Sequence, residues 1–256
     1  MNGVRLIMFT TQMPRYCNNL LHKLCKINPN QVHQKLQLAD LGLNINDFSK
    51  LRLSYNNLPI DQFYPSQTGT VREKLITRCR RFSSFQVKLI PNGLYQIQQN
   101  PDTVFSQDVT DFRKIPREFE SIEPYVIDQQ FLGLITNMVG LVNYFNPTTS
   151  RYNVAVHQVR LLSYPDTDSD NSPEGIHQDG ADYIVSALVL NKHNITQGQS
   201  IIYDEALGEI FRTELQTGEF IFQGDRNLWH DITPIKTVNN YIGYRDILGF
   251  DLKITS

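Results

Sequence analysis

The second half of the chain is a series of short segments in which apolar and polar residues alternate, and this pattern constrains the fold most strongly. Alternation with a period of two is typical of strands, because successive side chains of a strand point to opposite faces. Gly, Asp, Asn or Pro turns separate the segments, and no helical pattern lies between them. The segments are "YNVAVHQVRLLSY", "DYIVSALVLN", "QSIIYDEA", "GEIFRTEL", "GEFIFQG" and "YIGYRDILGFDLKI". We therefore predict an antiparallel sandwich or barrel over residues 151–256.

Residues 1–150 have a mixed pattern that predicts helices and an early strand. Leucines scattered among polar residues indicate short helices near the start of the chain, and the alternation of Phe85 and Val87 indicates a strand. The segment "YVIDQQFLGLITNMVGLVNYFNP" is the clearest helix, with Asp128 as its N-cap. No internal repeat or long linker is present, so we expect a single domain, residues 1–256, that is mainly β with N-terminal helices (α+β).

The composition is that of a soluble globular protein with no preference for a polyanion. The chain of 256 residues is 40% hydrophobic and 20% charged, and its formal net charge is −2. Three arginines close together, Arg78, Arg80 and Arg81, are more typical of a paired or solvated face than of a nucleic-acid site. We expect neither a nucleic acid nor a membrane as a partner.

The cysteines and the start of the chain predict a cytoplasmic protein. Three cysteines are present, and neither their odd number nor their spacing fits a disulfide framework or a metal-binding Cys-x-x-Cys pair. The opening "MNGVRLIMFTTQ" contains one short apolar run, which is too short for the core of a signal peptide or for a membrane span.

The segment "PEGIHQDGADY" places His177 and Asp179 two positions apart. If the segment is extended, both side chains face the same way and offer a nitrogen and an oxygen to one metal ion. Only two histidines follow: His193 lies in a polar turn, whereas His230 ends an apolar segment. Two histidines and one carboxylate leave part of the coordination sphere open, as in non-heme Fe(II) oxygenases. His-x-Asp by itself is a weak signal, and a structural histidine is the competing interpretation.

Arg245 strengthens the metal hypothesis, because it belongs to the last predicted strand and shares a face with Gly243 and Ile247. A cation that points into a barrel among apolar residues is costly unless an anion meets it. The planar guanidinium can grip a carboxylate through two hydrogen bonds, which suits the far end of a dicarboxylate. The competing interpretation is a salt bridge with Asp246 or Asp225.

These segments together resemble the iron(II) and 2-oxoglutarate dependent dioxygenases, and within them the bacterial group that hydroxylates free L-amino acids, typified by L-isoleucine dioxygenase. The segments that carry the resemblance are "HQVRL", "PEGIHQDGADY", "QGQSIIYD", "WHDITPI" and "GYRD", and they span roughly the second half of the chain. The earlier "LPIDQFYP" and "RCRRFSSF" are similar to the N-terminal portion of that group.

The resemblance implies a double-stranded β-helix, also called a jelly-roll or cupin-like core, flanked by helices. It further implies that His177, Asp179 and His230 are iron ligands and catalytic residues, and that Arg245 anchors the 5-carboxylate of the co-substrate 2-oxoglutarate. One departure is "QGQS", in which Gln197 replaces the first of two glycines that relatives commonly have.

The activity that the resemblance implies is hydroxylation by Fe(II), 2-oxoglutarate and O2, with release of succinate and CO2. The expected substrate is a small, aliphatic, free L-amino acid. Arg160 is a candidate for binding its carboxylate and Asp182 for binding its ammonium group. For Arg160 an ion pair at the surface or sheet edge is an equal alternative, and Asp182 could instead orient a metal ligand or cap a turn.

Two other functions remain open at the level of the sequence. One is a dioxygenase of the same fold that acts on a carrier-bound or peptidyl amino acid in natural-product biosynthesis. The other is a cupin-type barrel that binds metal as a sensor or binding module, without turnover. A metal binder alone has no need for a buried clamp for a dicarboxylate, so Arg245 favours an enzyme.

Overall fold

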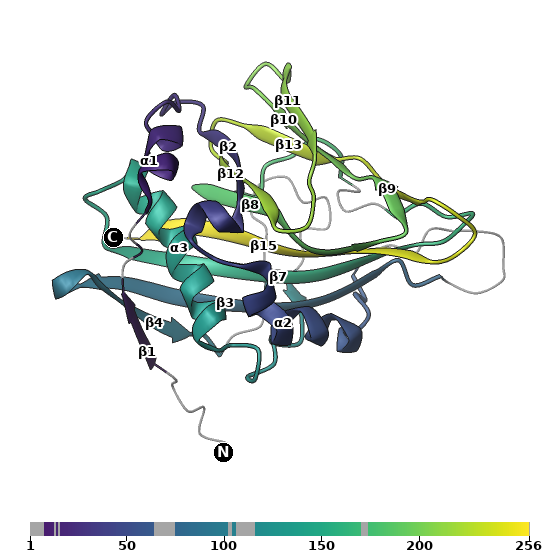
Figure 1. Ribbon diagram of the computed structural model, residues 1–256, viewed down its shortest axis with the longest axis horizontal. Coiled ribbons are helices and arrows are strands. Elements are labelled where there is room, and N and C mark those ends of the chain that lie inside the picture. The colour runs from purple at the N-terminus through teal and green to yellow at the C-terminus, as the bar shows by residue number, and fades with distance from the viewer. Residues whose placement is uncertain are drawn as a thin grey trace.

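An eight-stranded antiparallel sheet runs through the centre of the protein (Figure 1). The computed structural model describes residues 8–12, 14, 16–63, 75–101, 104–105, 116–169 and 174–255. The strands of the large sheet are, in spatial order, β1 (Met8–Gln12), β4 (Leu94–Gln99), β3 (Arg78–Ile90), β7 (Arg151–Ser163), β15 (Gly243–Thr255), β8 (Tyr183–His193), β12 (Glu219–Gly224) and β2 (His33–Gln37). The prediction of an antiparallel β core with helices in the first half is confirmed, and the sheet also takes four strands from residues 1–150.

Smaller groups of strands lie against the large sheet. They are β11 (Glu209–Glu214), β10 (Gln199–Tyr203) and β13 (Trp229–Ile232), then β14 (Ile235–Thr237) with β9 (Ile195–Gln197), and β5 (Val104–Phe105) with β6 (Arg117–Glu118). Ile202 of β10 and Ile235 of β14 belong to the same apolar cluster as Val159 of β7 and Ile247 of β15. The first two groups therefore pack on one face of the large sheet as a second layer.

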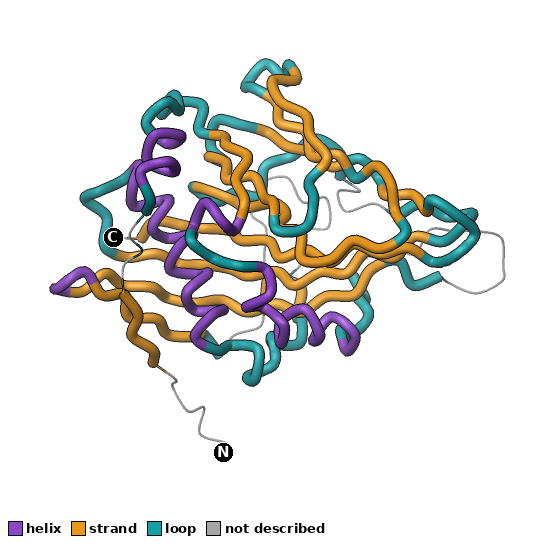
Figure 2. The backbone as a smooth tube through the Cα atoms, in the orientation of Figure 1, coloured by secondary structure: helices purple, strands orange, loops and turns teal. Residues whose placement is uncertain are grey.

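Helices cover the opposite face, where Figure 2 shows them in front of the strands. They are α1 (Asn18–Leu24), α2 (Ser49–Ser54) and α3 (Gln129–Phe145), with 3-10 turns η1 (Leu38–Leu41), η2 (Ile45–Phe48), η3 (Tyr55–Asn57) and η4 (Pro91–Gly93). The predicted long helix is α3, and the carboxylate of Asp128 accepts hydrogen bonds from the backbone N–H groups of Gln130 and Phe131, both at 3.1 Å. Leu134 and Met138 pack with Leu248 and Phe250 of β15 in the main apolar core.

Alternation along β15 assigns its residues to the two faces of the sheet. Leu248 and Phe250 belong to the core under α3, whereas Ile247 belongs to the cluster between the sheet and the second layer. Since successive side chains of a strand alternate, Arg245 shares the face of Ile247, and Asp246 lies on the helix face. One strand therefore contributes to two separate environments.

Strand β3 begins earlier than the alternation of Phe85 and Val87 suggests, and it includes the basic cluster. Arg78 forms an ion pair with Asp61 at 3.0 Å, and Arg81 forms one with Glu120 at 2.8 Å. Two of the three arginines are therefore in ion pairs, and the side chain of Arg78 is only 8% exposed. Within the described ranges, no helix has the length and apolar character that a membrane crossing requires.

We predict that Asp128→Ala lowers the free energy of unfolding by about 1 kcal/mol, because two N–H groups at the start of α3 lose their acceptor. Asp168→Ala is the control, since Asp168 is an exposed residue paired only with exposed Lys236 among the described residues, and we expect a change within about 0.5 kcal/mol. Urea denaturation of both variants measures the difference. Equal stabilities would mean that the cap does not contribute.

Candidate metal centre and cavity

His177 and His230 lie side by side because their backbones pair as an isolated antiparallel bridge. The N–H of His177 donates to the carbonyl of His230 at 3.0 Å, and the N–H of His230 donates back at 2.9 Å. The ring centroids are 4.3 Å apart, and His230 is also in register with Ile202 of β10. Two segments far apart in the sequence are thus held together by main-chain hydrogen bonds.

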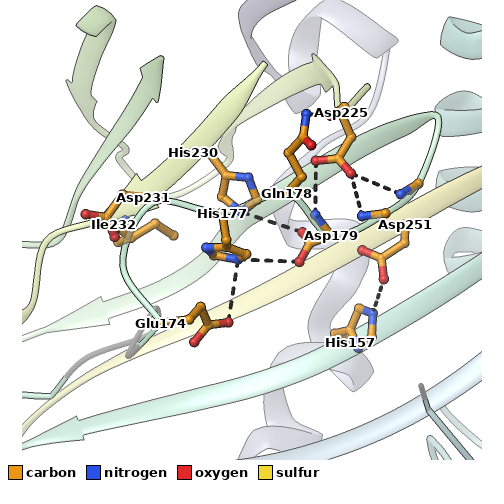
Figure 3. Close-up of polar contacts among 12 residues, drawn as sticks. His157, Glu174, His177, Gln178, Asp179, Asp225, His230, Asp231, Ile232 and Asp251 are labelled. Atoms are coloured by element: carbon orange, nitrogen blue, oxygen red, sulfur yellow. Dashed lines mark hydrogen bonds and ion pairs between the residues drawn. The ribbon is translucent and has the colours of Figure 1, made fainter. Parts of the chain in front are cut away.

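The carboxylate of Asp179 completes a group of three possible metal ligands (Figure 3). Its oxygens lie 3.5 Å from Nε2 of His177 and 3.5 Å from Nε2 of His230. One ligand atom from each residue lies within 4.8 Å of the others. His177 pairs as a single-residue bridge, whereas Asp179 lies in the loop that leads into β8. The convergence predicted from the two-residue spacing is found, although only part of the segment is extended.

The hydrogen bonding of His177 suits metal binding once its ring is neutral, and the pKa values of the two imidazoles are shifted in opposite directions. Nδ1 of His177 contacts the carbonyl of Gly175 at 2.8 Å, so this nitrogen carries the hydrogen and Nε2 offers its lone pair when the ring is neutral. Burial lowers the pKa of His177, but the hydrogen bond and charge of Asp179 outweigh burial and raise it to about 9. Burial, followed by the charge of His177, lowers the pKa of His230 to about 4.

The donor set of two imidazole nitrogens and one carboxylate oxygen fits a ferrous ion with open coordination positions. The carboxylate of Asp179 supplies negative charge, because interactions with His230 and His177 hold its pKa below the usual range despite burial. A divalent cation at this point would replace the proton that His177 shares with Asp179.

Asp225 and Gln178 hold the loop that carries Asp179. The buried carboxylate of Asp225 accepts hydrogen bonds from three successive backbone N–H groups, at 3.2 Å from Asp179, 2.7 Å from Gly180 and 3.0 Å from Ala181 (Figure 3). The amide of Gln178 donates to the carbonyl of Asp225 at 2.6 Å. Burial and the nearby charge of Asp179 raise the pKa of Asp225 to about 7. Only the structure reveals this support, because the two loops are distant in sequence.

A cavity adjoins the three candidate ligands, between them and the inward face of the large sheet. Apolar Val159 and Ile247 line its floor, and Glu174 lies beside the ligands, with a carboxylate oxygen 3.6 Å from Nε2 of His177. The cavity also has a basic part that the sequence did not assign to it, formed by Arg78 and Arg80 of β3 and by Arg117 of β6.

Arg245 is buried, with 1% of its surface exposed, and points between the sheet and the second layer. Nη1 donates to the carbonyl of Gly198 at 2.9 Å, and neither Nε nor Nη2 has a hydrogen-bond partner among the described residues. Burial lowers its pKa to about 10, and the charge of Glu214 acts in the opposite direction, so Arg245 is a cation at neutral pH. The alternative ion pairs are not found, because Asp246 binds Arg160 and Asp225 binds the Asp179 loop.

Gly198 allows Arg245 to take this position. A Cβ atom on Gly198 would lie 2.9 Å from Nη1 of Arg245 and 2.6 Å from Cγ2 of Ile235. Its backbone is left-handed, with φ +67°, and Gln197 before it is also left-handed, with φ 65°. The turn thus keeps a glycine-like conformation at Gln197, where relatives commonly have glycine.

Arg160 and Asp182, the candidates for the substrate's charged groups, do not line this cavity within the described part of the chain. Arg160 lies on the helix face of β7 and binds both oxygens of Asp246, at 2.6 and 2.8 Å. Asp182 pairs with Arg226 and accepts a hydrogen bond from the backbone N–H of Ile254 at 2.6 Å. Strand alternation explains the position of Arg160, since it shares a face with Gln158 and not with Val159.

We predict that Asp225→Asn weakens the binding of a divalent metal about 10- to 100-fold, because an amide nitrogen would face backbone N–H groups that now meet a carboxylate. Asp204→Asn is the matched control. One oxygen of Asp204 accepts from the N–H groups of Ala206 and Gly208 in an exposed turn, and an asparagine can replace it there. Calorimetric titration with Co²⁺ measures both affinities. An unchanged affinity for Asp225→Asn would mean that Asp225 does not hold the loop of Asp179 in its metal-binding position.

Comparison with known proteins agrees with this geometry. The family model described as 2OG-Fe dioxygenase matches residues 52–251. Among solved structures, a BsmA homologue from Methylobium petroleophilum PM1 superposes with a TM-score of 0.76 at 19% identity, covering 94% of each chain. IDO from Bacillus thuringiensis gives 0.70 at 15% identity, covering 93% of this chain and 100% of that one. The Fe(II)/α-ketoglutarate-dependent dioxygenase TqaL gives 0.65 at 15% identity, covering 93% and 90%.

These likenesses confirm the predicted jelly-roll fold. No curated protein sequence matches the chain. The family match extends from within α2 into β15 and includes every candidate ligand. The chain therefore belongs to the 2OG-Fe dioxygenase family, whose members use Fe(II), 2-oxoglutarate and O2.

Proposed function

We propose that the protein hydroxylates a small, aliphatic, free L-amino acid and releases succinate and CO2 from 2-oxoglutarate. In this proposal His177, Asp179 and His230 hold the iron, and Arg245 binds the far carboxylate of 2-oxoglutarate. The observation that carries the proposal is the convergence of three metal-binding side chains beside a cavity, together with a buried arginine that lacks an ion-pair partner among the described residues.

Iron, 2-oxoglutarate and O2 together supply the oxidising power that replaces a C–H bond of the substrate with a C–OH bond. The protein's part is to position and shield the reactants. The contact of Nδ1 with Gly175 orients the ring of His177, and Asp225 fixes the loop of Asp179. His230 and Arg245 are both buried, so each is shielded from bulk water.

The cavity supports an aliphatic substrate because part of its lining is apolar. Val159, Ile232 and Ile247 lie on the same lining as the candidate ligands. Branched side chains at these positions favour contact with a hydrocarbon group over a charged one.

The two rival functions predict different results. A dioxygenase for carrier-bound or peptidyl amino acids would oxidise the linked amino acid and not the free one. A sensor or binding module would bind metal without consuming 2-oxoglutarate. The buried Arg245 supports an enzyme over the sensor, because a buried cation without an ion pair among the described residues suits a carboxylate ligand that a metal binder alone does not need.

We predict that at least one aliphatic amino acid gains the mass of one oxygen atom when standard amino acids are incubated with protein, Fe(II), 2-oxoglutarate and air. His177→Ala and Asp179→Ala should abolish both this product and substrate-dependent succinate, because each removes a ligand atom of the group. His193→Ala, at the exposed end of β8, should retain activity. Oxidation only of carrier-linked amino acids would support the first rival, and metal binding without any succinate would support the second.

We predict that Arg245→Gln weakens the binding of 2-oxoglutarate roughly thirtyfold, or about 2 kcal/mol, because a buried charge pair loses its cation. Gly198→Ala should have a similar effect, since its methyl group collides with Arg245. Gly218→Ala is the matched control, because Gly218 is also left-handed but a Cβ there meets nothing within 4 Å. Both alanines carry the backbone cost of about 1 to 2 kcal/mol in stability.

The measurement is an anaerobic titration of the Fe(II)-loaded protein with 2-oxoglutarate, followed by the visible charge-transfer band of the chelated co-substrate. Gly218→Ala should bind 2-oxoglutarate as the unaltered protein does. If Arg245→Gln also binds it normally, another residue must hold the far carboxylate.

A further inference from the structure

The basic part of the cavity is formed by three buried arginines that face inward. Arg78 and Arg80 are two positions apart on β3, so their side chains share one face, and Arg117 reaches the same space from β6. Their exposed fractions are 7%, 5% and 1%. They line the same cavity as His177, Asp179 and His230.

Arg80 has a neutral partner where a buried cation would ordinarily have an anion. One of its terminal nitrogens contacts Nδ1 of His157, and Nε2 of His157 lies 2.8 Å from a carboxylate oxygen of Asp251. Arginine can only donate, so Nδ1 must accept, and the hydrogen of His157 lies on Nε2 toward Asp251. Burial also lowers the pKa of His157, which keeps the ring neutral.

Asp61, whose backbone N–H donates to the carbonyl of Arg78 at 3.1 Å, does not neutralise Arg80 directly. A carboxylate oxygen of Asp61 lies 3.0 Å from Nε of Arg78, so Asp61 forms its ion pair with Arg78. Burial, with the positive charge of Arg78, lowers the pKa of Arg80 to about 9, so Arg80 remains a cation at neutral pH. Nε of Arg80 is buried without a hydrogen-bond partner among the described residues.

Aromatic rings restrict how these guanidinium groups can bind a ligand. The Cζ atom of Arg80 lies 4.5 Å from the ring centroid of Phe119 and 5.1 Å from that of Phe105, and Cζ of Arg117 lies 4.9 Å from Phe105. Rings over the flat faces leave the N–H edges as the sites for hydrogen bonds. Such an edge matches the two oxygens of a carboxylate.

The sheet register places the apolar lining of the cavity next to the arginines. Arg80 is in register with Val159, and Val159 is in register with Ile247. Both apolar residues line the same cavity as Arg80 and the candidate metal ligands. An anion held by Arg80 would therefore have its apolar part beside Val159 and Ile247.

We propose that Arg80, supported by Arg78 and Arg117, binds the substrate's carboxylate, so that the cavity selects a small anion whose apolar part lies over Val159 and Ile247. This inference rests on the proposed function and deepens it. An amino acid linked to a carrier has no free carboxylate, so the arginines favour a free acid over a carrier-bound one.

The test compares small ligands that lack either the charge of the carboxyl group or the charge of the amino group. L-Leucine has a carboxylate and an ammonium group, L-leucinamide lacks the carboxylate, and isocaproate lacks the ammonium group. Corresponding sets for valine, isoleucine and methionine, and N-acetyl derivatives of the four acids, complete the panel. Each is titrated without oxygen into the protein loaded with Fe(II) and 2-oxoglutarate, and the change in the charge-transfer band gives the dissociation constant.

We expect the unaltered protein to bind at least one acid tenfold or more tightly than its amide. Arg80→Gln should weaken the acid about tenfold and leave the amide unchanged, so that the preference disappears. Binding of 2-oxoglutarate should stay normal. Arg80→Lys keeps the charge but not the planar edge, so it should retain part of the preference for the acid. This variant replaces Arg80→Gln in the test if the glutamine variant does not fold.

Arg81→Gln is the matched control, because it removes the next arginine of β3, which faces the other way and pairs with Glu120. It should not change either affinity. The inference is overturned if no anion of the panel binds, if Arg80→Gln keeps the preference for the acid, or if that variant loses 2-oxoglutarate instead. If isocaproate binds but no amino acid is oxidised, the carboxylate site at Arg80 is supported and the proposed hydroxylation of an amino acid is contradicted.

Discussion

The two backbone hydrogen bonds between His177 and His230 are the contact on which the metal centre depends. They join a loop before β8 to strand β13, which are far apart in the sequence, and they set the two imidazoles side by side. Because main-chain atoms make the contact, side-chain changes around it leave the spacing of the rings in place. Asp225 then fixes the third ligand by gripping the backbone after Gln178.

Strand alternation separates the structural charges from the functional ones. On β15, Asp246 faces the helices and binds Arg160, whereas its neighbour Arg245 faces the second layer and has no ion pair among the described residues. On β3, Arg81 faces outward to Glu120, whereas Arg80 lines the cavity. Asp246 and Arg81, on the face opposite the cavity, are thus neutralised by the protein, whereas Arg245 and Arg80 have no ion pair of their own among the described residues.

The sequence was sufficient for the features that depend on local periodicity or on a specific set of residue types. The antiparallel core, the helix capped by Asp128, and the convergence of His177, Asp179 and His230 all follow from such patterns. The basic cluster predicts a paired or solvated face, and Arg78 and Arg81 are indeed paired. The position of Arg80 in the cavity does not follow from the sequence, which does not show that Arg80 lies near Phe105 and Phe119.

The position of Arg160 shows a second limit. Its charge and its place in a strand make it a candidate, yet a strand has two faces, and only the packing of α2 and η3 decides which face lines the cavity. Asp182 likewise follows the metal-binding loop in sequence but is turned toward β15 and Arg226. Both roles remain predictions that the geometry of the cavity does not support.

The buried arginines also connect ligand binding to stability. A cation removed from water is costly when no anion meets it, and Arg80 and Arg245 each have neutral hydrogen-bond partners in the described structure. An anion that binds only the folded chain would offset this cost, so each ligand would stabilise the folded state by an amount that rises with the logarithm of its concentration above Kd. The same charges that make the cavity specific for acids therefore make the ligand-free fold less stable than an apolar cavity would.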